Sequence, residues 1–268
     1  MSNMENHING IMSGGAKNRK SSCRLHGNFT EYMQPNGKWS GCPHCALDDA
    51  HSETLSEIKD QRSGAAGRSL EKMRGDSLIP KRFIDKKVSD FLVSEESVEV
   101  SRKQRLAKTA CERYINNFDE RLSRGGGMIF YGGVGTGKTH LAYSIANELL
   151  EKGHPVMGID VYELVDIVKE SFSKKDGSTE REAIKRFAGA LDLLVIDEIG
   201  AQLGTDFEKL LLFKVINERY KQMKPTIIIS NLDEENLKDY VGIRVYDRML
   251  EGGGMSVCFD WPSHRIRR

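Results

Sequence analysis

Residues 128–150 read MIFYGGVGTGKTHLAYSIANELL: a short apolar run, a glycine-rich loop, and then apolar residues at helical spacing. Gly132–Thr139 fits the pattern of a glycine, any four residues and Gly-Lys-Thr that binds nucleotide phosphates. Glycines let the backbone wrap around phosphates with its N–H groups pointing inward, and the following helix adds its positive N-terminal end. The alternative is an ordinary glycine-rich turn, and the strand before the motif and the helix after it argue against that alternative.

The motif also gives a role to its two polar end residues. Lys138 would neutralise the β- and γ-phosphates, and the Thr139 hydroxyl would bind Mg²⁺. We therefore predict that the chain binds and hydrolyses ATP. The predicted nucleotide-binding residues are Gly132, Gly133, Val134, Gly135, Thr136, Gly137, Lys138, Thr139 and His140.

A second apolar run ends in a pair of acids. Leu193–Ile196 is unbroken, as a strand buried on both faces requires, and it is followed by Asp197 and Glu198. Ligands of open α/β sheets bind at the carboxyl ends of the strands. We expect Asp197 to hold Mg²⁺, directly or through water, and Glu198 to polarise the attacking water. The alternative is a strand that ends in a solvated turn with two acids.

The next buried strand ends at Asn231. A polar residue at this place could hydrogen-bond the γ-phosphate or the attacking water. The alternative is a helix N-cap before Asp233, since Asn and Ser cap helices well. We favour the catalytic role for Asn231.

Apolar runs and helical periods alternate through the second half of the chain. Strand–helix alternation of this kind predicts a parallel sheet flanked by helices, an α/β fold. The predicted strands cover residues 128–131, 156–159, 193–196 and 226–230, and the predicted helices cover residues 139–150, 161–172, 183–191 and 207–223.

The composition is that of an ordinary globular protein. The chain has 268 residues, 38% hydrophobic and 29% charged, and a formal net charge of +1, so bulk charge does not indicate a nucleic-acid partner. No run of about 18 apolar residues is present, and the polar N-terminus lacks the apolar segment of a signal peptide. We therefore expect a cytoplasmic protein.

Four metal-ligand residues lie close to the N-terminus. Cys23-x-x-His26 and Cys42-x-x-Cys45 form two chelating pairs with 15 residues between them. Two-residue spacing lets both members of a pair bind one tetrahedral Zn²⁺ ion, and such a closed site would be structural. The alternatives are unrelated thiols, and His44 as a competing ligand.

These features divide the chain into four predicted regions. They are a disordered basic tail (1–20), a zinc-binding module (21–47), a charged linker (48–78) and an ATPase domain (79–268).

Five segments of the ATPase region resemble the AAA+ helicase-loader family. They read GGVGTGKTHLAYSIANELL, LLVIDEIG, IIISN, GIRVYDRM and FDWPSHR, within a resemblance that runs from about Ile79 to Arg268. The chain is similar to loaders of the DnaC type and, more distantly, to DnaI loaders and IstB transposition-helper ATPases. The resemblance implies a five-stranded parallel sheet with flanking helices and no C-terminal helical lid.

The resemblance also implies roles for arginines. Arg248 matches the arginine finger that reaches the γ-phosphate of a neighbouring subunit, Arg244 is a weaker candidate, and Arg265 matches the sensor arginine. A cation supplied in trans would couple hydrolysis to assembly. The alternative for Arg244 and Arg248 is a solvated helix face that pairs with Asp239 or Asp247.

The function implied by the resemblance is loading of a DnaB-type replicative helicase onto single-stranded DNA by a nucleotide-dependent oligomer. Its ATPase would be slow alone and stimulated by DNA or a partner. The module at 21–47 resembles in kind the helicase-binding domain of DnaI loaders. A DNA-binding finger is the alternative for this module, with the residues Lys17, Arg19, Lys20, Arg24, Lys38, Phe29, Tyr32 and Trp39.

Two other functions remain open. One is an IstB-like ATPase that binds duplex DNA and assists a transposase. The other is a zinc-dependent DNA-binding regulator that uses ATP only as a structural ligand, and Glu198 argues against it.

Overall fold

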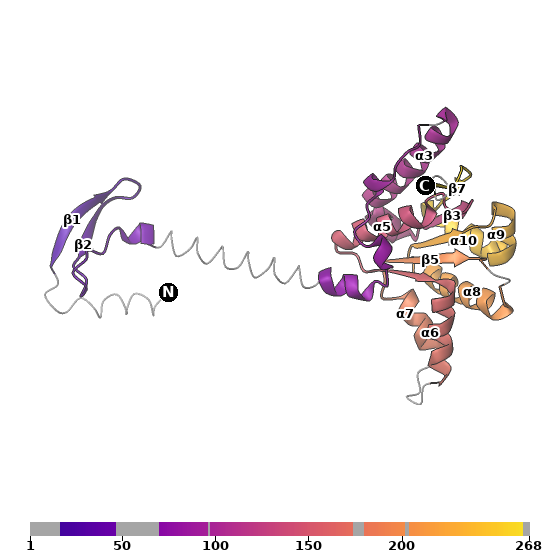
Figure 1. Ribbon diagram of the computed structural model, residues 1–268. Helices are drawn as coiled ribbons and strands as arrows, with labels where there is room; N and C mark the ends of the chain where they lie inside the picture. The colour runs from indigo at the N-terminus through magenta and orange to yellow at the C-terminus, as the bar shows by residue number, and fades with distance from the viewer. Residues whose placement is uncertain (1–16, 47–69, 96, 174–179, 202–203, 265–268) are drawn as a thin grey trace. The chain divides into compact units, whose positions relative to one another are not determined.

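The computed structural model describes residues 17–46, 70–95, 97–173, 180–201 and 204–264 (Figure 1). The chain divides into two units, Met1–Arg68 and Ser69–Arg268. Within the described residues, no helix combines the length and the apolar character that crossing a bilayer requires.

The N-terminal unit contains a small antiparallel hairpin. Strands β1 (Asn18–Cys23) and β2 (Gly27–Tyr32) pair along their whole length, and a bridge joins Met33 to Trp39. The hairpin places Cys23 at the end of β1, directly before the turn that carries His26. Since β1 begins at Asn18, the predicted tail boundary at residue 20 is wrong. Residues 1–16 of that tail lie outside the described part of the chain.

The C-terminal unit is built on a five-stranded sheet. Its strand order is β4-β5-β6-β3-β7, and every neighbouring pair is parallel, as predicted. The apolar runs form the interior strands because helices cover both faces of the sheet and exclude water from both. The strands are β3 (Met128–Gly132), β4 (Val156–Asp160), β5 (Leu193–Ile199), β6 (Thr226–Ser230) and β7 (Met255–Phe259).

Helices flank the sheet and form one apolar core on each of its faces. The first core contains side chains of α3 and α5, and the second contains side chains of α6, α7, α8, α9 and α10. Figure 1 shows the helices around the central sheet. They are α3 (Val98–Asn116), α4 (Phe118–Arg124), α5 (Lys138–Glu151), α6 (Val161–Ser173), α7 (Glu180–Ala188), α8 (Asp206–Lys221), α9 (Glu234–Val241) and α10 (Ile243–Leu250).

The ATPase unit begins earlier than the sequence indicated. Residues 70–76 are helical, and Leu70 and Met73 pack against the first core. Their spacing of three residues puts both side chains on one helix face, which explains why two apolar residues suffice to dock this segment. The predicted linker boundary at residue 78 is therefore wrong, and residues 47–69 lie outside the described part. Two short 3₁₀ helices follow, η1 (Lys81–Phe83) and η2 (Val88–Asp90).

Candidate functional site

The glycine-rich loop leaves strand β3 and enters helix α5. Gly132 and Gly137 have φ angles of +118° and +98°, in the region that favours glycine. A Cβ atom at Gly132 would lie 2.6 Å from the carbonyl oxygen of Phe259, and one at Gly137 would lie 2.6 Å from the Phe91 ring. Both glycines are therefore required by backbone conformation and by close packing.

The Lys138 side chain lies over this loop. Lys138 is buried, and its Nζ donates to the carbonyl oxygens of Gly132 at 2.8 Å and Gly133 at 2.6 Å. The Thr136 hydroxyl donates to the same Gly133 oxygen at 2.8 Å. The ammonium group is thus held where the phosphates bind in loops of this type.

Strand β5 brings the acid pair to the loop. Asp197 is buried, and its Oδ1 accepts a hydrogen bond from the N–H of Glu198 at 2.7 Å. The Thr139 side chain also hydrogen-bonds the Asp197 carboxylate, while burial raises the pKa of Asp197. A hydroxyl beside a buried carboxylate is the oxygen donor set that suits Mg²⁺.

Glu198 has an unusual backbone. Its φ angle is +60°, and the pairing of β5 with β6 shifts register between Ile196 and Ile199. A bulge of this kind re-aims a side chain, and strained backbone of this kind is concentrated at functional sites. The Glu198 side chain is exposed and lies at the wall of the cavity described next.

One cavity of about 480 Å³ brings the predicted side chains together. Asn231 also reaches it, and the N-cap of α9 is Asp233, whose side chain accepts from the N–H of Asn236. The N-cap alternative for Asn231 is therefore wrong. The residues that line the cavity are Arg82, Phe83, Lys86, Val134, Gly135, Thr136, Gly137, Lys138, Thr139, His140, Asp197, Glu198 and Asn231.

Three residues of that wall were not assigned a role from the sequence: Arg82, Phe83 and Lys86. Their only signal in the sequence was their place near the start of the resembling region, which begins at about Ile79. His140, which was assigned, is half-buried, and burial lowers its pKa. Its Nε2 has no hydrogen-bond partner among the described residues. This nitrogen is itself shielded from solvent, so the imidazole packs as part of the wall.

The predicted arginines of α10 lie away from the cavity wall. Arg248 hydrogen-bonds the side chain of Asn217, and its guanidinium lies 5.0 Å from the centre of the Tyr220 ring. Arg244 is exposed and makes no hydrogen bond or ion pair with the described residues. Neither arginine pairs with Asp239 or Asp247 in the described part. Arg265 lies outside it.

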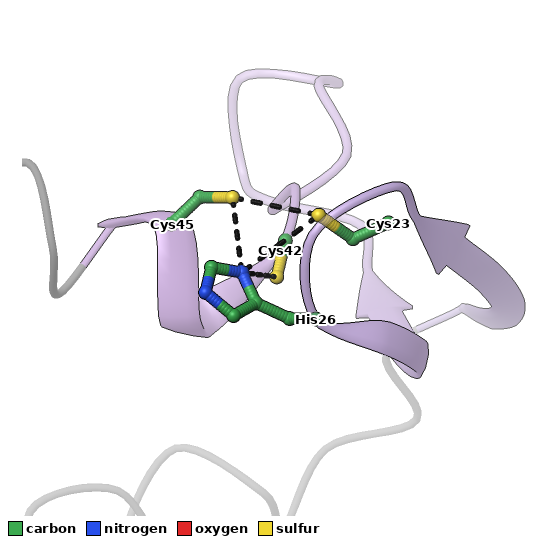
Figure 2. A group of neighbouring side chains, drawn as sticks. All are labelled: Cys23, His26, Cys42 and Cys45. Atoms are coloured by element: carbon green, nitrogen blue, oxygen red, sulfur yellow. Dashed lines mark hydrogen bonds between the residues drawn. The ribbon is translucent and has the colours of Figure 1, made fainter.

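The four cysteine and histidine residues of the N-terminal unit converge (Figure 2). His26 Nδ1 lies 3.8, 3.7 and 3.4 Å from the Sγ atoms of Cys23, Cys42 and Cys45, and the Sγ atoms of Cys23 and Cys45 are 3.5 Å apart. In a tetrahedral zinc site, S–S and S–N edges are about 3.8 and about 3.6 Å, as Zn–S and Zn–N bond lengths require. The donor set therefore fits a metal ion of this size.

The surroundings of the cluster shift the pKa values of two of its cysteines. Backbone hydrogen bonds from Leu25 and His26 lower the pKa of Cys23 to about 6, which favours the thiolate that binds metal. The neighbouring thiols raise the pKa of Cys45, chiefly through its hydrogen bond with Cys23, to about 12. Crowded thiolates repel one another, and a bound cation would remove that repulsion. His44 is not part of the cluster.

Curated proteins of known function resemble the ATPase part of this chain. Replicative helicase loader DnaC of Escherichia coli (strain K12) is 35% identical over 161 residues, which is 60% of this chain and 64% of that protein. DnaC of Buchnera aphidicola subsp. Baizongia pistaciae is 35% identical over 156 residues, 58% of this chain and 62% of that protein. The chain thus spans less than two thirds of the curated relatives that it matches.

Solved structures share the fold. The DnaC helicase loader matches with a TM-score of 0.56 at 22% identity and covers 67% of this chain and 99% of its own. DnaI matches with a TM-score of 0.54 at 20% identity, over 70% and 95%. AMPPCP-bound DnaA from Aquifex aeolicus matches with a TM-score of 0.53 at 24% identity, over 68% and 51%. Residues 105–245 match the IstB-like ATP binding protein family over more than half of the chain, and the chain belongs to this AAA+ family.

Proposed function

We propose that the chain is an ATP-dependent loader of a replicative helicase. One observation carries the proposal: a single cavity joins Lys138, Thr139 and the acid pair in a chain that is 35% identical to a replicative helicase loader. The cavity supports binding and hydrolysis of ATP. The similarity supports helicase loading as the process that ATP hydrolysis drives.

Hydrolysis of ATP would use the residues of the cavity in separate roles. Lys138 and the loop N–H groups bind the β- and γ-phosphates. Glu198 polarises the attacking water, and Asn231 orients that water or the γ-phosphate. Thr139 and Asp197 would hold Mg²⁺, which neutralises phosphate charge.

The lone chain should hydrolyse ATP slowly. Arg82 of η1 reaches the cavity, but neither Arg244 nor Arg248 of α10 lines it. Among the described residues of a single copy, the arginine that we assign to the transition state is therefore absent from the cavity. We expect faster hydrolysis with DNA or a partner, because either could bring a second copy into contact.

That further cation would come from the second copy. We propose Arg248 as the arginine finger, with Arg244 as the second candidate and Arg265 as a sensor within the same chain. Arg248 would have to leave its contacts with Asn217 and Tyr220, whereas Arg244 is already exposed. Supplying the finger in trans makes hydrolysis depend on assembly.

The N-terminal unit would hold one structural Zn²⁺ and capture the helicase. Two observations weaken the alternative of a DNA-binding finger. Arg19 forms an ion pair with Glu31 at 2.7 Å, and its guanidinium lies 4.2 Å from the centre of the Trp39 ring. Trp39, the strongest base-stacking candidate of the module, is thus already in contact with the Arg19 guanidinium. Arg19 in turn is already paired with Glu31.

Single-stranded DNA would bind to the ATPase unit. Helix α7 exposes Arg181, Lys185 and Arg186, three cations on a short helix. Lys and Arg side chains of this kind contact phosphates without regard to sequence. Binding should therefore weaken steeply as the salt concentration rises.

A second function is favoured by the family match. Residues 105–245 match the IstB-like ATP binding protein family. IstB-type ATPases, which the sequence also resembles, are transposition helpers. A transposition helper would assemble on duplex DNA and would have no need of the helicase.

The test asks whether the protein co-elutes with the replicative helicase of the same organism in the presence of a non-hydrolysable ATP analogue. The wild-type chain is compared with Cys42→Ser/Cys45→Ser. A complex that needs the two cysteines supports the loader and assigns helicase capture to the N-terminal unit. Absence of a complex, together with nucleotide-dependent assembly on duplex DNA, favours the transposition helper.

A further inference from the structure

Helix α3 has an outer face that carries both charge and apolar surface. Val98 is 89% and Leu106 is 59% exposed, about two turns apart on the helix. Arg102 and Arg105 lie between them, and all four line a groove of about 600 Å³. These two arginines make no ion pair with the described residues, whereas their neighbour Lys103 pairs with Asp260 at 2.7 Å.

Helix α9 has an outer face of the opposite charge. Glu235 and Asp239 are exposed four residues apart, on one side of the helix, and neither forms an ion pair with the described residues. Their neighbour Glu234 is already paired with Lys238 at 2.7 Å. Ile243, the first residue of α10, is 57% exposed and follows α9 by two residues.

The two faces complement each other but belong to different sides of the unit. Figure 1 shows α3 and α9 apart, on either side of the sheet. A single copy therefore cannot bring them together. Complementary surfaces at different places on one molecule make a heterologous contact, which joins copies head to tail.

We propose that the outer face of α3 binds the outer face of α9 and the start of α10 of a second copy. Arg102 and Arg105 pair with Glu235 and Asp239, and Val98 and Leu106 pack against Ile243. This inference rests on the self-association in the proposed function and names the surface that makes it.

Helix α3 is connected to the phosphate loop. On the inner face of α3, Lys108 donates to the carbonyl oxygens of Ser89 at 3.0 Å and Phe91 at 3.2 Å. The Phe91 ring packs against Gly137 of the phosphate loop. The helix that carries the proposed face is therefore joined to this loop through Phe91.

The test reverses the charges of each face in turn. Assembly is measured by sedimentation velocity in the presence of Mg²⁺ and a non-hydrolysable ATP analogue, without DNA. One variant is Arg102→Glu/Arg105→Glu, and the other is Glu235→Lys/Asp239→Lys. Each alone should assemble more than about tenfold more weakly, because like charges would then face each other. Lys72→Glu/Lys169→Glu is the control with an equal charge change at two exposed residues outside both faces, and it should assemble like wild type.

The mixture of the two variants gives the decisive reading. Every contact in the mixture can pair opposite charges, so assembly should return to the wild-type level. Each variant should bind the analogue as a monomer with wild-type affinity, since none of the four residues lines the cavity. Loss of that affinity would show that the variant is misfolded. In that case the single variants Arg102→Gln and Asp239→Asn replace the double variants. Both should then assemble more weakly than wild type.

Three outcomes overturn the proposal. If wild type assembles and both variants assemble equally well, the self-association stands and this surface is wrong. If both variants are impaired and the mixture is not restored, the two faces do not meet. A wild-type chain that stays monomeric contradicts both this surface and the self-association of the proposed function.

Discussion

The indole nitrogen of Trp261 donates a hydrogen bond of 3.0 Å to the carbonyl oxygen of Thr136, in the centre of the phosphate loop. Trp261 is buried, and on either side of it two more backbone bonds reach the same loop. The N–H of Gly133 donates to Phe259 at 3.0 Å, and the N–H of His264 donates to Gly135 at 3.0 Å. The end of β7 and the segment after it thus hold the loop through two backbone hydrogen bonds and the Trp261 indole.

Replacing Trp261 with Phe should loosen the loop and keep most of the apolar contact. The variant loses one buried hydrogen bond, which contributes about 1 kcal/mol. We expect ATP affinity to fall about fivefold, which is that free energy expressed as a binding ratio. Titration with a fluorescent ATP analogue measures the change. Cys258→Ser, an exposed change on β7, is the control and should bind like wild type, and equal binding by Trp261→Phe would contradict the role of the indole.

Glu198→Gln should separate binding from hydrolysis. The amide keeps the shape of the side chain but cannot take a proton, so turnover should fall by about 100-fold or more. ATP binding should remain. Lys138→Ala should lose binding as well, since it removes the buried ammonium group from the loop. Hydrolysis and nucleotide binding are measured on both variants. Undiminished turnover by Glu198→Gln would exclude the assigned role, whereas a variant that loses turnover but still supports function would revive the regulator hypothesis.

Asp197→Asn should stabilise the nucleotide-free protein at neutral pH. Burial raises the pKa of Asp197, so the folded protein binds a proton more tightly than the unfolded chain does. The ionised carboxylate therefore lowers stability above the raised pKa, and that cost disappears as the pH falls through it. Thermal unfolding of both proteins over a pH series should show that the variant has the higher melting temperature at neutral pH and that this difference shrinks on acidification. A difference that grows on acidification would contradict a raised pKa of Asp197.

Removing the metal should unfold the N-terminal unit and spare the ATPase. We expect one Zn²⁺ per chain by native mass spectrometry and none in Cys42→Ser/Cys45→Ser. Cys258→Ser should retain the ion, because Cys258 is outside the cluster. Turnover of ATP by the lone chain should be unchanged by a zinc-selective chelator when Mg²⁺ is kept in excess. A wild-type metal content in the double variant would rule out the four-ligand site.

Mixing two inactive variants tests the finger in trans. Arg248→Ala keeps an intact cavity, and Lys138→Ala keeps an intact arginine, so the mixture should regain part of the assembly-stimulated ATPase. The same mixture with Arg244→Ala decides between the two arginines. The arginine whose variant is inactive alone and rescued by Lys138→Ala is the finger. If neither variant loses the stimulated rate, no arginine of α10 acts in trans.

Much of the nucleotide site could be predicted because its chemistry is local in sequence. Gly132–Thr139 and the pair Asp197-Glu198 each mark a strand end, and the parallel sheet brings strand ends to one edge. The left-handed backbone of Glu198 could not be predicted. It arises from the register shift between β5 and β6, a relation between two strands.

Three cavity residues were missed for a similar reason. Arg82, Phe83 and Lys86 reach the cavity because the segment before η2 folds across α5. The Asn147 side chain of α5 holds that segment by donating to the carbonyl oxygens of Phe83 and Lys86. Nothing local in the sequence indicates such a contact between residues more than 60 positions apart.

Arg219 lies on a helix that was predicted correctly, yet its burial was not expected. Its side chain is fully buried, and its guanidinium donates to the Thr226 hydroxyl of β6 at 3.0 Å. A charged side chain is expected at the protein surface. Burial of the Arg219 guanidinium is favourable because carbonyl oxygens from several segments surround it. The backbone carbonyl oxygens that accept from it belong to Phe187, Ala188, Leu191, Asp192 and Pro225.

Helicase loading itself is the most direct measurement. The helicase of the same cell is incubated with circular single-stranded DNA, and the amount bound to the DNA is measured with and without this protein and ATP. We predict that bound helicase increases only with both, and that Cys42→Ser/Cys45→Ser and Lys138→Ala abolish the increase. Equal helicase on the circle in the presence and absence of the protein would contradict the account.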